Sequence, residues 1–324
     1  MMQIIVPYLY VHLTLERHKF MVTNSAVDYF IRLVQINAAP KKERLIADEL
    51  LKELKSLGFT VKEDATGKQI AGNAGNIVAY LAGSKPGNIM FCAHMDRVEQ
   101  GLNIKPRIVD GIISSDGTTI LAADDLAGVS AILAGLNVVK GSDKQHAGIE
   151  VLFTVCEEQG LLGSKYLDYA ELKAHNGYIL DTSGRIGRIV NRAPYKGILT
   201  IEVFGKASHA GNFPERGVNA VTAAAHLLDG IRDGRLGAEA TANFGSSYGG
   251  GENIGTVCDY VVIRGEVRNH DLQQLKEYCA YVEKYCADRI KDTKATCKVS
   301  FKLDYEGFCV KQNEKVLQYL VATM

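Results

Sequence analysis

Residues 89–96 decide the fold, because their sequence Ile-Met-Phe-Cys-Ala-His-Met-Asp joins an apolar run of strand length to a His-x-Asp motif. Three other short apolar runs occur in the first half of the chain, at residues 76–81, 149–155 and 178–180. Continuous apolar runs of this length indicate strands that are buried on both faces of a sheet. The sequence therefore predicts a central sheet in this half.

Helical patterns separate these runs. Apolar residues recur every three or four positions from residue 41 to Gly58, and again over residues 125–140. Strands that alternate with helices are typical of α/β proteins, in which helices cover both faces of the sheet. We therefore expect a mixed, mostly parallel sheet with helices on both of its faces.

The pattern changes near Pro194. Residues 199–203 alternate apolar and polar side chains, as expected for a strand with one solvated face. The elements after it follow the order β-α-β-β-α-β, which is that of a ferredoxin-like sandwich. We expect this part, residues 195–306, to be an inserted dimerisation or lid domain. Residues 21–194 and 307–324 would then form the catalytic domain, and residues 1–20 an unstructured extension before a second start at Met21.

Composition excludes several classes of function. The 324 residues include 37 Lys+Arg and 37 Asp+Glu, so the net charge is zero and no basic field is available for nucleic acid. The seven cysteines form no CxxC pair, which fits a reducing cytoplasm. Residues 1–15 are mostly apolar but shorter than the roughly 20 residues that span a bilayer. We expect no stable membrane association, with a weak membrane anchor as the alternative.

Acidic and imidazole groups follow the apolar runs or precede the helix at residues 125–140. They are His94, Asp96, Asp124, Glu157, Glu158 and Asp181. In open α/β sheets, ligands bind at the carboxyl ends of the strands, where these side chains should converge. Five carboxylates repel one another unless a cation is present. One imidazole among carboxylates suits Zn²⁺, with Mn²⁺ or Co²⁺ as alternatives. Taken singly, the Asp and Glu pairs could instead begin the helices that follow them.

A series of motifs carries a family resemblance. The motifs are His94-Met95-Asp96, Ser115-Asp116-Gly117-Thr118-Thr119, Ala123-Asp124-Asp125, Glu157-Glu158-x-Gly160 and Ala207-Ser208-His209-Ala210-Gly211. From about Ser25 onward the chain resembles the co-catalytic zinc hydrolases related to peptidase T, carboxypeptidase G and aminoacylase. The Ser-Asp-Gly-Thr-Thr stretch is most similar to the peptidase T-like branch.

The resemblance implies roles for the candidate site residues. The complete protein would hold two Zn²⁺ ions per subunit, bridged by Asp124. His94 and Asp181 would complete one zinc site, and Glu158 would ligate the other ion. Asp96 would orient His94, and Glu157 would be the general base.

The resemblance also implies that three residues of the inserted domain bind substrate. They are His209, Asn253 and Arg268, which in the family belong to the lid of a partner subunit and clamp the substrate carbonyl and carboxylate. An arginine fork suits a peptide carboxylate. A homodimer through residues 195–306 is therefore expected.

The sequence departs from the family pattern at three points. Arg97 stands where relatives have a small residue, and Leu126 where they often have lysine. The family's last zinc ligand is a histidine near the end of the catalytic domain, and no candidate for it precedes Met324. We therefore expect a C-terminal part of that domain to be missing from this sequence.

These features predict a metal-dependent aminopeptidase that hydrolyses short peptides, of the tripeptidase type. An amidohydrolase or carboxypeptidase of the same clan, which would remove acyl groups from amino acids, is one alternative. A catalytically inactive binding or dimerisation protein is another, because the last zinc ligand is absent from the sequence.

Overall fold

The structure is a computed structural model that describes residues 16–185 and 187–323. These residues divide into two units. The first contains the described residues up to Asn191 and those from Val310 onward, and the second spans Arg192–Cys309. None of the helices in the described part of the chain has the length and apolar character needed to cross a membrane.

The first unit is built on a five-stranded sheet with the order β1-β2-β6-β3-β7. Its strands are β1 (Thr60–Glu63), β2 (Ile77–Leu81), β3 (Asn88–His94), β6 (Gly148–Thr154) and β7 (Gly177–Ile179). The strands β6, β3 and β7 run parallel, whereas β1 and β2 are antiparallel to their neighbours. The mixed α/β fold is confirmed. Strand β2 is antiparallel to both of its neighbours although its apolar run resembles the others, because burial on both faces does not fix a strand's direction.

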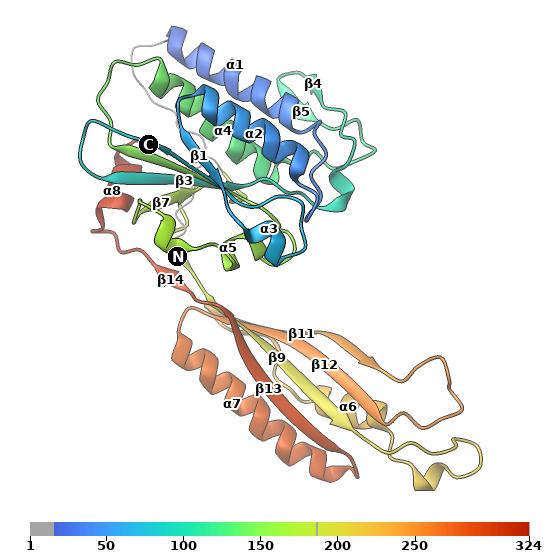
Figure 1. Cartoon of the computed structure of the whole chain (residues 1–324). Coiled ribbons are helices and arrows are strands. Elements are labelled where there is room, and N and C mark those ends of the chain that lie inside the picture. Colours follow the sequence, from blue (N-terminus) through green and yellow to red (C-terminus); the bar gives the residue numbers. More distant parts are fainter. Residues whose placement is uncertain (1–15, 186, 324) are drawn as a thin grey trace. The chain divides into compact units, whose positions relative to one another are not determined.

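Helices cover one face of this sheet (Figure 1). They are α1 (Glu16–Leu33), α2 (Arg44–Ser56) and α4 (Ala123–Lys140). Their apolar side chains pack on Ile77, Ala79, Val151 and Phe153, which alternate along β2 and β6. Leu152 points to the other face, into a smaller cluster that includes Leu167. Both faces are therefore buried, as the continuous apolar runs predicted.

Shorter elements complete the first unit. They are α3 (Thr66–Gln69), α5 (Leu162–Lys165), α8 (Lys315–Ala322) and the hairpin of β4 (Arg107–Val109) and β5 (Ile112–Ser114). Of the extension expected at residues 1–20, residues 1–15 lie outside the described part, and residues 16–20 begin α1.

The second unit is an antiparallel sheet with the order β10-β11-β12-β9-β13. Its strands are β9 (Tyr195–Phe204), β10 (Gly234–Gly237), β11 (Ala240–Gly249), β12 (Tyr260–Asn269) and β13 (Thr296–Tyr305). The helices α6 (Ala220–Leu228) and α7 (Leu272–Arg289) pack on one face (Figure 1). Apart from the short β10, the order is that of a ferredoxin-like sandwich. The strands β8 (Arg192–Ala193) and β14 (Phe308–Cys309) pair where the chain enters and leaves this unit.

Candidate metal centre

The candidate site lies at one edge of the first unit's sheet. His94 is the last residue of β3, Glu157 and Glu158 follow β6, and Asp181 follows β7. Because these three strands are parallel, their carboxyl ends meet at the same edge. Asp124 and Asp125 approach this edge from the start of α4. The alternation of strand and helix thus delivers each of these groups to one place.

Asp96 ties the imidazole to the loop after β6. Nδ1 of His94 lies 2.9 Å from the backbone oxygen of Asp96 and 3.3 Å from its carboxylate. The same carboxylate accepts hydrogen bonds from the backbone amides of Glu157 (2.9 Å) and Glu158 (3.1 Å). Asp96 is fully buried. It therefore orients the ring and the two glutamates together, so that Nε2 of His94 faces the site.

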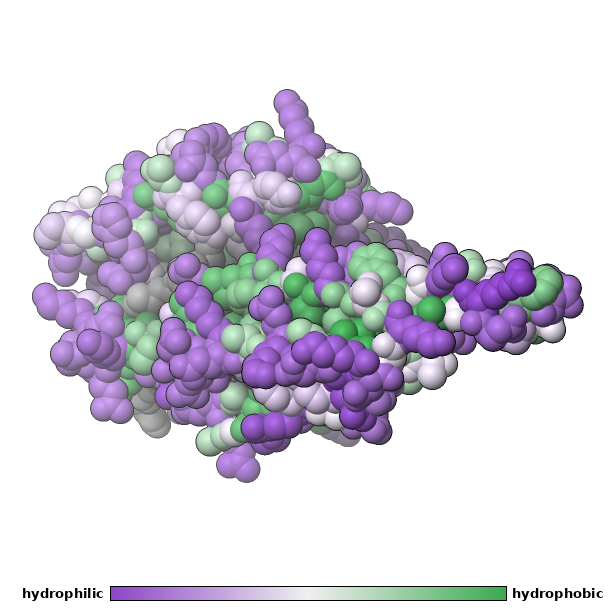
Figure 2. All heavy atoms as spheres, turned by 90° about the horizontal axis from the view of Figure 1, so that it is seen from below, coloured by the Kyte–Doolittle hydropathy of each residue, from purple (hydrophilic) through white to green (hydrophobic). Residues whose placement is uncertain are grey.

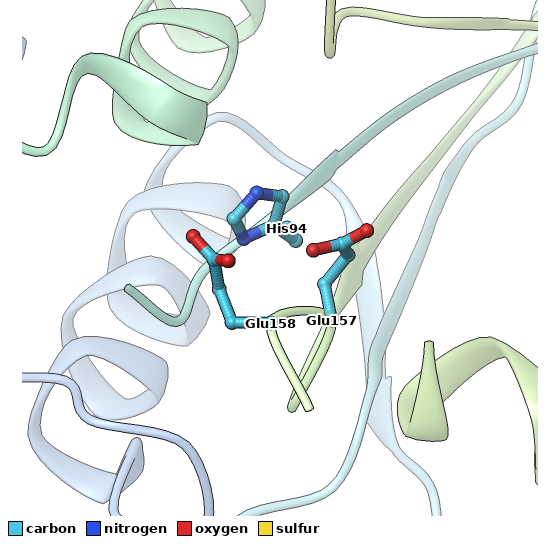
Figure 3. A group of neighbouring side chains, drawn as sticks. All are labelled: His94, Glu157 and Glu158. Carbon is cyan, nitrogen blue, oxygen red and sulfur yellow. The ribbon is translucent and has the colours of Figure 1, made fainter. Parts of the chain in front are cut away.

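Two groups of side chains could each hold a metal ion. One consists of His94, Glu157 and Glu158, and the other of His94, Asp125 and Asp181. Within each group the ligand atoms lie within 4.8 Å of one another. Figure 3 shows the carboxylates of Glu157 and Glu158 turned toward the imidazole of His94.

The two neighbouring aspartates have different surroundings. Oδ1 of Asp124 lies 2.8 Å from Nε2 of His94, but its side chain is 73 % exposed and belongs to neither group. Asp125 is buried, and its carboxylate accepts a hydrogen bond from the backbone amide of His94 (3.2 Å). Sequence reasoning named Asp124 alone. The Asp-Asp pair itself was the only signal for Asp125, and spacing could not show which of the two turns inward.

The carboxylates at this edge carry more negative charge than their surroundings balance. The pKa of Glu157 is raised to about 7, mainly by burial and also by Asp181, Asp96 and Glu158, whereas His94 lowers it. Burial is also the main cause that raises the pKa of Asp125, of Asp181 and of Glu158. Burial alone would lower the pKa of His94, but hydrogen bonds to Asp124 and Asp96 raise it.

This donor set fits a divalent cation. A cation would offset the repulsion among the carboxylates and favour their ionised forms. One imidazole nitrogen with several carboxylate oxygens is a ligand set that zinc accepts. The groups within reach of one another are thus chemically suited to a metal centre.

The three residues expected to bind substrate lie in the second unit. His209 and Thr256 form an isolated β-bridge, and the side chain of Asn253 donates to Thr256 (3.2 Å). These two loops therefore lie together. Nδ1 of His209 accepts from the amides of Gly211 and Asn212, both at 3.1 Å, so its proton is on Nε2.

Arg268 lies at the other end of the same sheet. It pairs with Lys196 near the start of β9, whereas Asn253 and Thr256 precede the opposite end of β12. Its guanidinium is bound to Glu266 through Nε (2.9 Å) and Nη2 (3.3 Å). Within the second unit, the structure brings His209 and Asn253 together and leaves Arg268 apart from them.

Comparison with known proteins identifies the family. Residues 76–191 match the model of Peptidase family M28, and residues 196–294 match the Peptidase dimerisation domain. The crystal structure of the aminopeptidase PepT from Bacillus cereus is 37 % identical in sequence, with a TM-score of 0.82. The match covers 91 % of this chain and 79 % of that one. This chain belongs to the peptidase T-like metallopeptidases.

Two further relatives support this membership. The crystal structure of a tripeptidase from Staphylococcus aureus is 33 % identical in sequence, with a TM-score of 0.85. The match covers 92 % of this chain and 80 % of the tripeptidase. An uncharacterised protein of Bacillus subtilis is 35 % identical over 293 residues, which are 90 % of this chain and 79 % of the relative. As a peptidase T-like metallopeptidase the protein is a metal-dependent enzyme, in agreement with the ligand groups around His94.

Proposed function

We propose that the protein is a zinc-dependent aminopeptidase that hydrolyses free tripeptides. The observation that carries this proposal is that two groups of possible metal ligands share His94 at the carboxyl edge of the sheet. The similarity to an aminopeptidase and to a tripeptidase, each over about four fifths of its length, supports the substrate class.

Different residues would hold the metal and move the proton. The metal ligands would be His94, Asp124, Asp181 and Glu158. Buried Asp125 supports His94, because its carboxylate accepts a hydrogen bond from the backbone amide of His94. When bound, a divalent metal lowers the pKa of water and polarises the scissile carbonyl. Glu157 would take the proton from the attacking water and deliver it to the leaving amine. Burial raises its pKa to about 7 in the metal-free protein, and a bound cation would favour the ionised form that accepts a proton.

Residues of the second unit would bind the peptide. We infer that Nε2 of His209 donates to the substrate carbonyl, because its Nδ1 is occupied by two backbone amides. Asn253 would assist from the neighbouring loop. Arg268 would bind the C-terminal carboxylate, in exchange for its bond to Glu266.

A comparison of substrates tests the proposed function. The metal-stripped protein should gain activity on a free tripeptide when Zn²⁺ is added, and should release the N-terminal residue first. N-acyl amino acids should be hydrolysed at least about 100-fold more slowly, because a site built around a free peptide leaves polar groups unpaired with them. Faster turnover of N-acyl amino acids would make the protein an amidohydrolase instead.

We also propose that the protein is a homodimer and works in the cytoplasm. The match of residues 196–294 to a dimerisation domain supports the first inference. In the described sheet β13 is an edge strand, whose unpaired backbone groups favour pairing with another chain. Seven free cysteines fit a reducing compartment.

A groove beside this edge strand is the surface we assign to the partner copy. Figure 2 shows apolar side chains lying among charged ones on the face of the molecule seen from below. The groove is lined by Leu199, Lys276, Cys279, Ala280, Glu283, Val299, Ser300 and Phe301.

Sedimentation tests the dimer. Ala280→Arg, which places a long charged side chain in the groove, should convert the dimer to a monomer at micromolar concentration. Glu277→Arg, on an exposed position of α7 outside the groove, is the matched control and should remain dimeric. A monomeric wild-type protein would contradict the proposal.

A further inference from the structure

Three consecutive backbone amides after β6 donate to buried carboxylates. The amide of Cys156 donates to Oε1 of Glu43 (3.1 Å), and those of Glu157 and Glu158 donate to the two oxygens of Asp96. Cys156 has a φ of 56°, in the left-handed region that side chains other than glycine rarely adopt. The turn that aims the two glutamates therefore depends on acceptors supplied by other parts of the chain.

Glu43 holds this turn from outside the two ligand groups. It precedes α2, is fully buried, and belongs to neither ligand group. Its Oε1 also accepts from the backbone amide of Lys41 (2.9 Å), a second residue with positive φ (69°). One carboxylate oxygen thus joins two left-handed turns that are more than a hundred residues apart in sequence.

We propose that Glu43 is a positioning residue for peptide hydrolysis, which acts by holding the Cys156 turn so that Glu157 and Glu158 face His94. The proposal rests on the proposed function. Without Oε1 the buried amide of Cys156 loses its acceptor, and the left-handed turn can relax. A displacement of about 1 Å in a reacting group can reduce turnover by about 100-fold.

Substitutions at position 43 separate the acceptor from its charge. Glu43→Gln keeps an oxygen acceptor, whereas Glu43→Met has similar length and none. We expect Glu43→Met to lower kcat by about 10- to 100-fold with KM within about threefold, and Glu43→Gln to retain kcat within about threefold. If the methionine variant does not fold, Glu43→Asp, whose oxygen is withdrawn by one methylene group, should give an intermediate loss.

Glu150→Met is the matched control. Glu150 is also fully buried, and it lies near the start of β6, at the opposite end of the strand from Cys156. Its carboxylate accepts hydrogen bonds from the backbone amides of Lys173 and Ala174. The control should lower the unfolding midpoint but leave the kcat of the folded enzyme unchanged. An equal loss of kcat in both methionine variants, or wild-type kcat in Glu43→Met, would overturn the proposal. An equal loss in Glu43→Gln and Glu43→Met would show that the charge matters, and would overturn it too.

Metal binding provides a readout that does not depend on activity. In a titration of the metal-stripped protein with Co²⁺, followed by visible absorption, Glu43→Met should bind about 10-fold more weakly than Glu150→Met, because Glu158 is misplaced. Equal affinities would overturn the positioning role. If the wild type binds Co²⁺ but cleaves no tripeptide, the proposed function fails, and the titration still decides the role of Glu43.

Discussion

Glu157→Gln is expected to stop turnover while leaving the metal bound. Glutamine has the same shape as glutamate but cannot accept a proton from water, so it removes the general base alone. The backbone amide that donates to Asp96 (2.9 Å) is unchanged, so the loop should keep its conformation. The substitution therefore separates proton transfer from metal binding.

The size of the effect follows from the surroundings of Glu157. Burial and neighbouring carboxylates bring its pKa to about 7 in the metal-free protein. A positioned general base contributes about 100- to 10,000-fold to the rate. We expect kcat to fall by at least about 100-fold, which corresponds to about 2.7 kcal/mol of activation free energy.

Two assays on two variants test this reasoning. Initial rates with a free tripeptide give kcat, and metal analysis after dialysis gives the zinc content. Glu157→Gln should keep its zinc, whereas Glu158→Gln should lose part of it, because we assign Glu158 as a ligand. The reverse result, with zinc lost from Glu157→Gln and kept by Glu158→Gln, would exchange the two roles and refute the assignment.

Three other predictions follow from the structure. Gly128→Ala should destabilise the protein by about 1–3 kcal/mol in chemical unfolding, because a Cβ there would overlap the carboxylate of Asp125 and the backbone oxygen of Leu180. Gly135→Ala on the same helix meets nothing within 4 Å and should stabilise it by about 0.5–1 kcal/mol. Burial raises the pKa of Glu43 from 4.5 to about 7, because the folded protein favours the protonated carboxyl group. The contribution of this group to the free energy of unfolding is therefore fully present below pH 4.5 and is lost as the pH rises through 7. Between pH 5 and pH 8 the metal-free wild type should therefore lose about 2 kcal/mol of unfolding free energy relative to Glu43→Gln, and equal pH dependence would contradict this. If His209 acts on the partner's site, mixing the inactive variants Glu157→Gln and His209→Ala should restore activity in mixed dimers, and no restoration would place His209 in its own subunit's site.

The α/β fold could be predicted from the sequence because each strand that is buried on both faces has a continuous apolar run. The runs at residues 76–81, 89–93, 149–155 and 178–180 became β2, β3, β6 and β7 within one or two residues. Strand β1 was missed, because its Thr-Val-Lys-Glu sequence lies at a sheet edge and is only half-buried. The direction of β2 could not be predicted, since it depends on the path of the chain between strands.

The site residues that directly follow a strand could be predicted from the sequence. Residues that reach the site only through tertiary contacts could not. His94, Glu157, Glu158 and Asp181 come directly after apolar runs, so their meeting at one edge could be expected. Glu43 gave no such signal. Its contact with Cys156 joins positions 113 residues apart, and a glutamate before a helix is ordinarily a surface residue.

The central claim is that metal held at His94 makes this protein an aminopeptidase, and a zinc titration followed by peptide hydrolysis tests it most directly. The metal-stripped protein is given a free tripeptide or its N-acetylated counterpart while Zn²⁺ is added, with His94→Ala as the control. We predict that cleavage of the free tripeptide appears with zinc binding, that the N-acetylated peptide stays intact, and that His94→Ala neither binds zinc tightly nor cleaves. Undiminished cleavage by the metal-stripped protein or by His94→Ala, or equal cleavage of the N-acetylated peptide, would contradict the account.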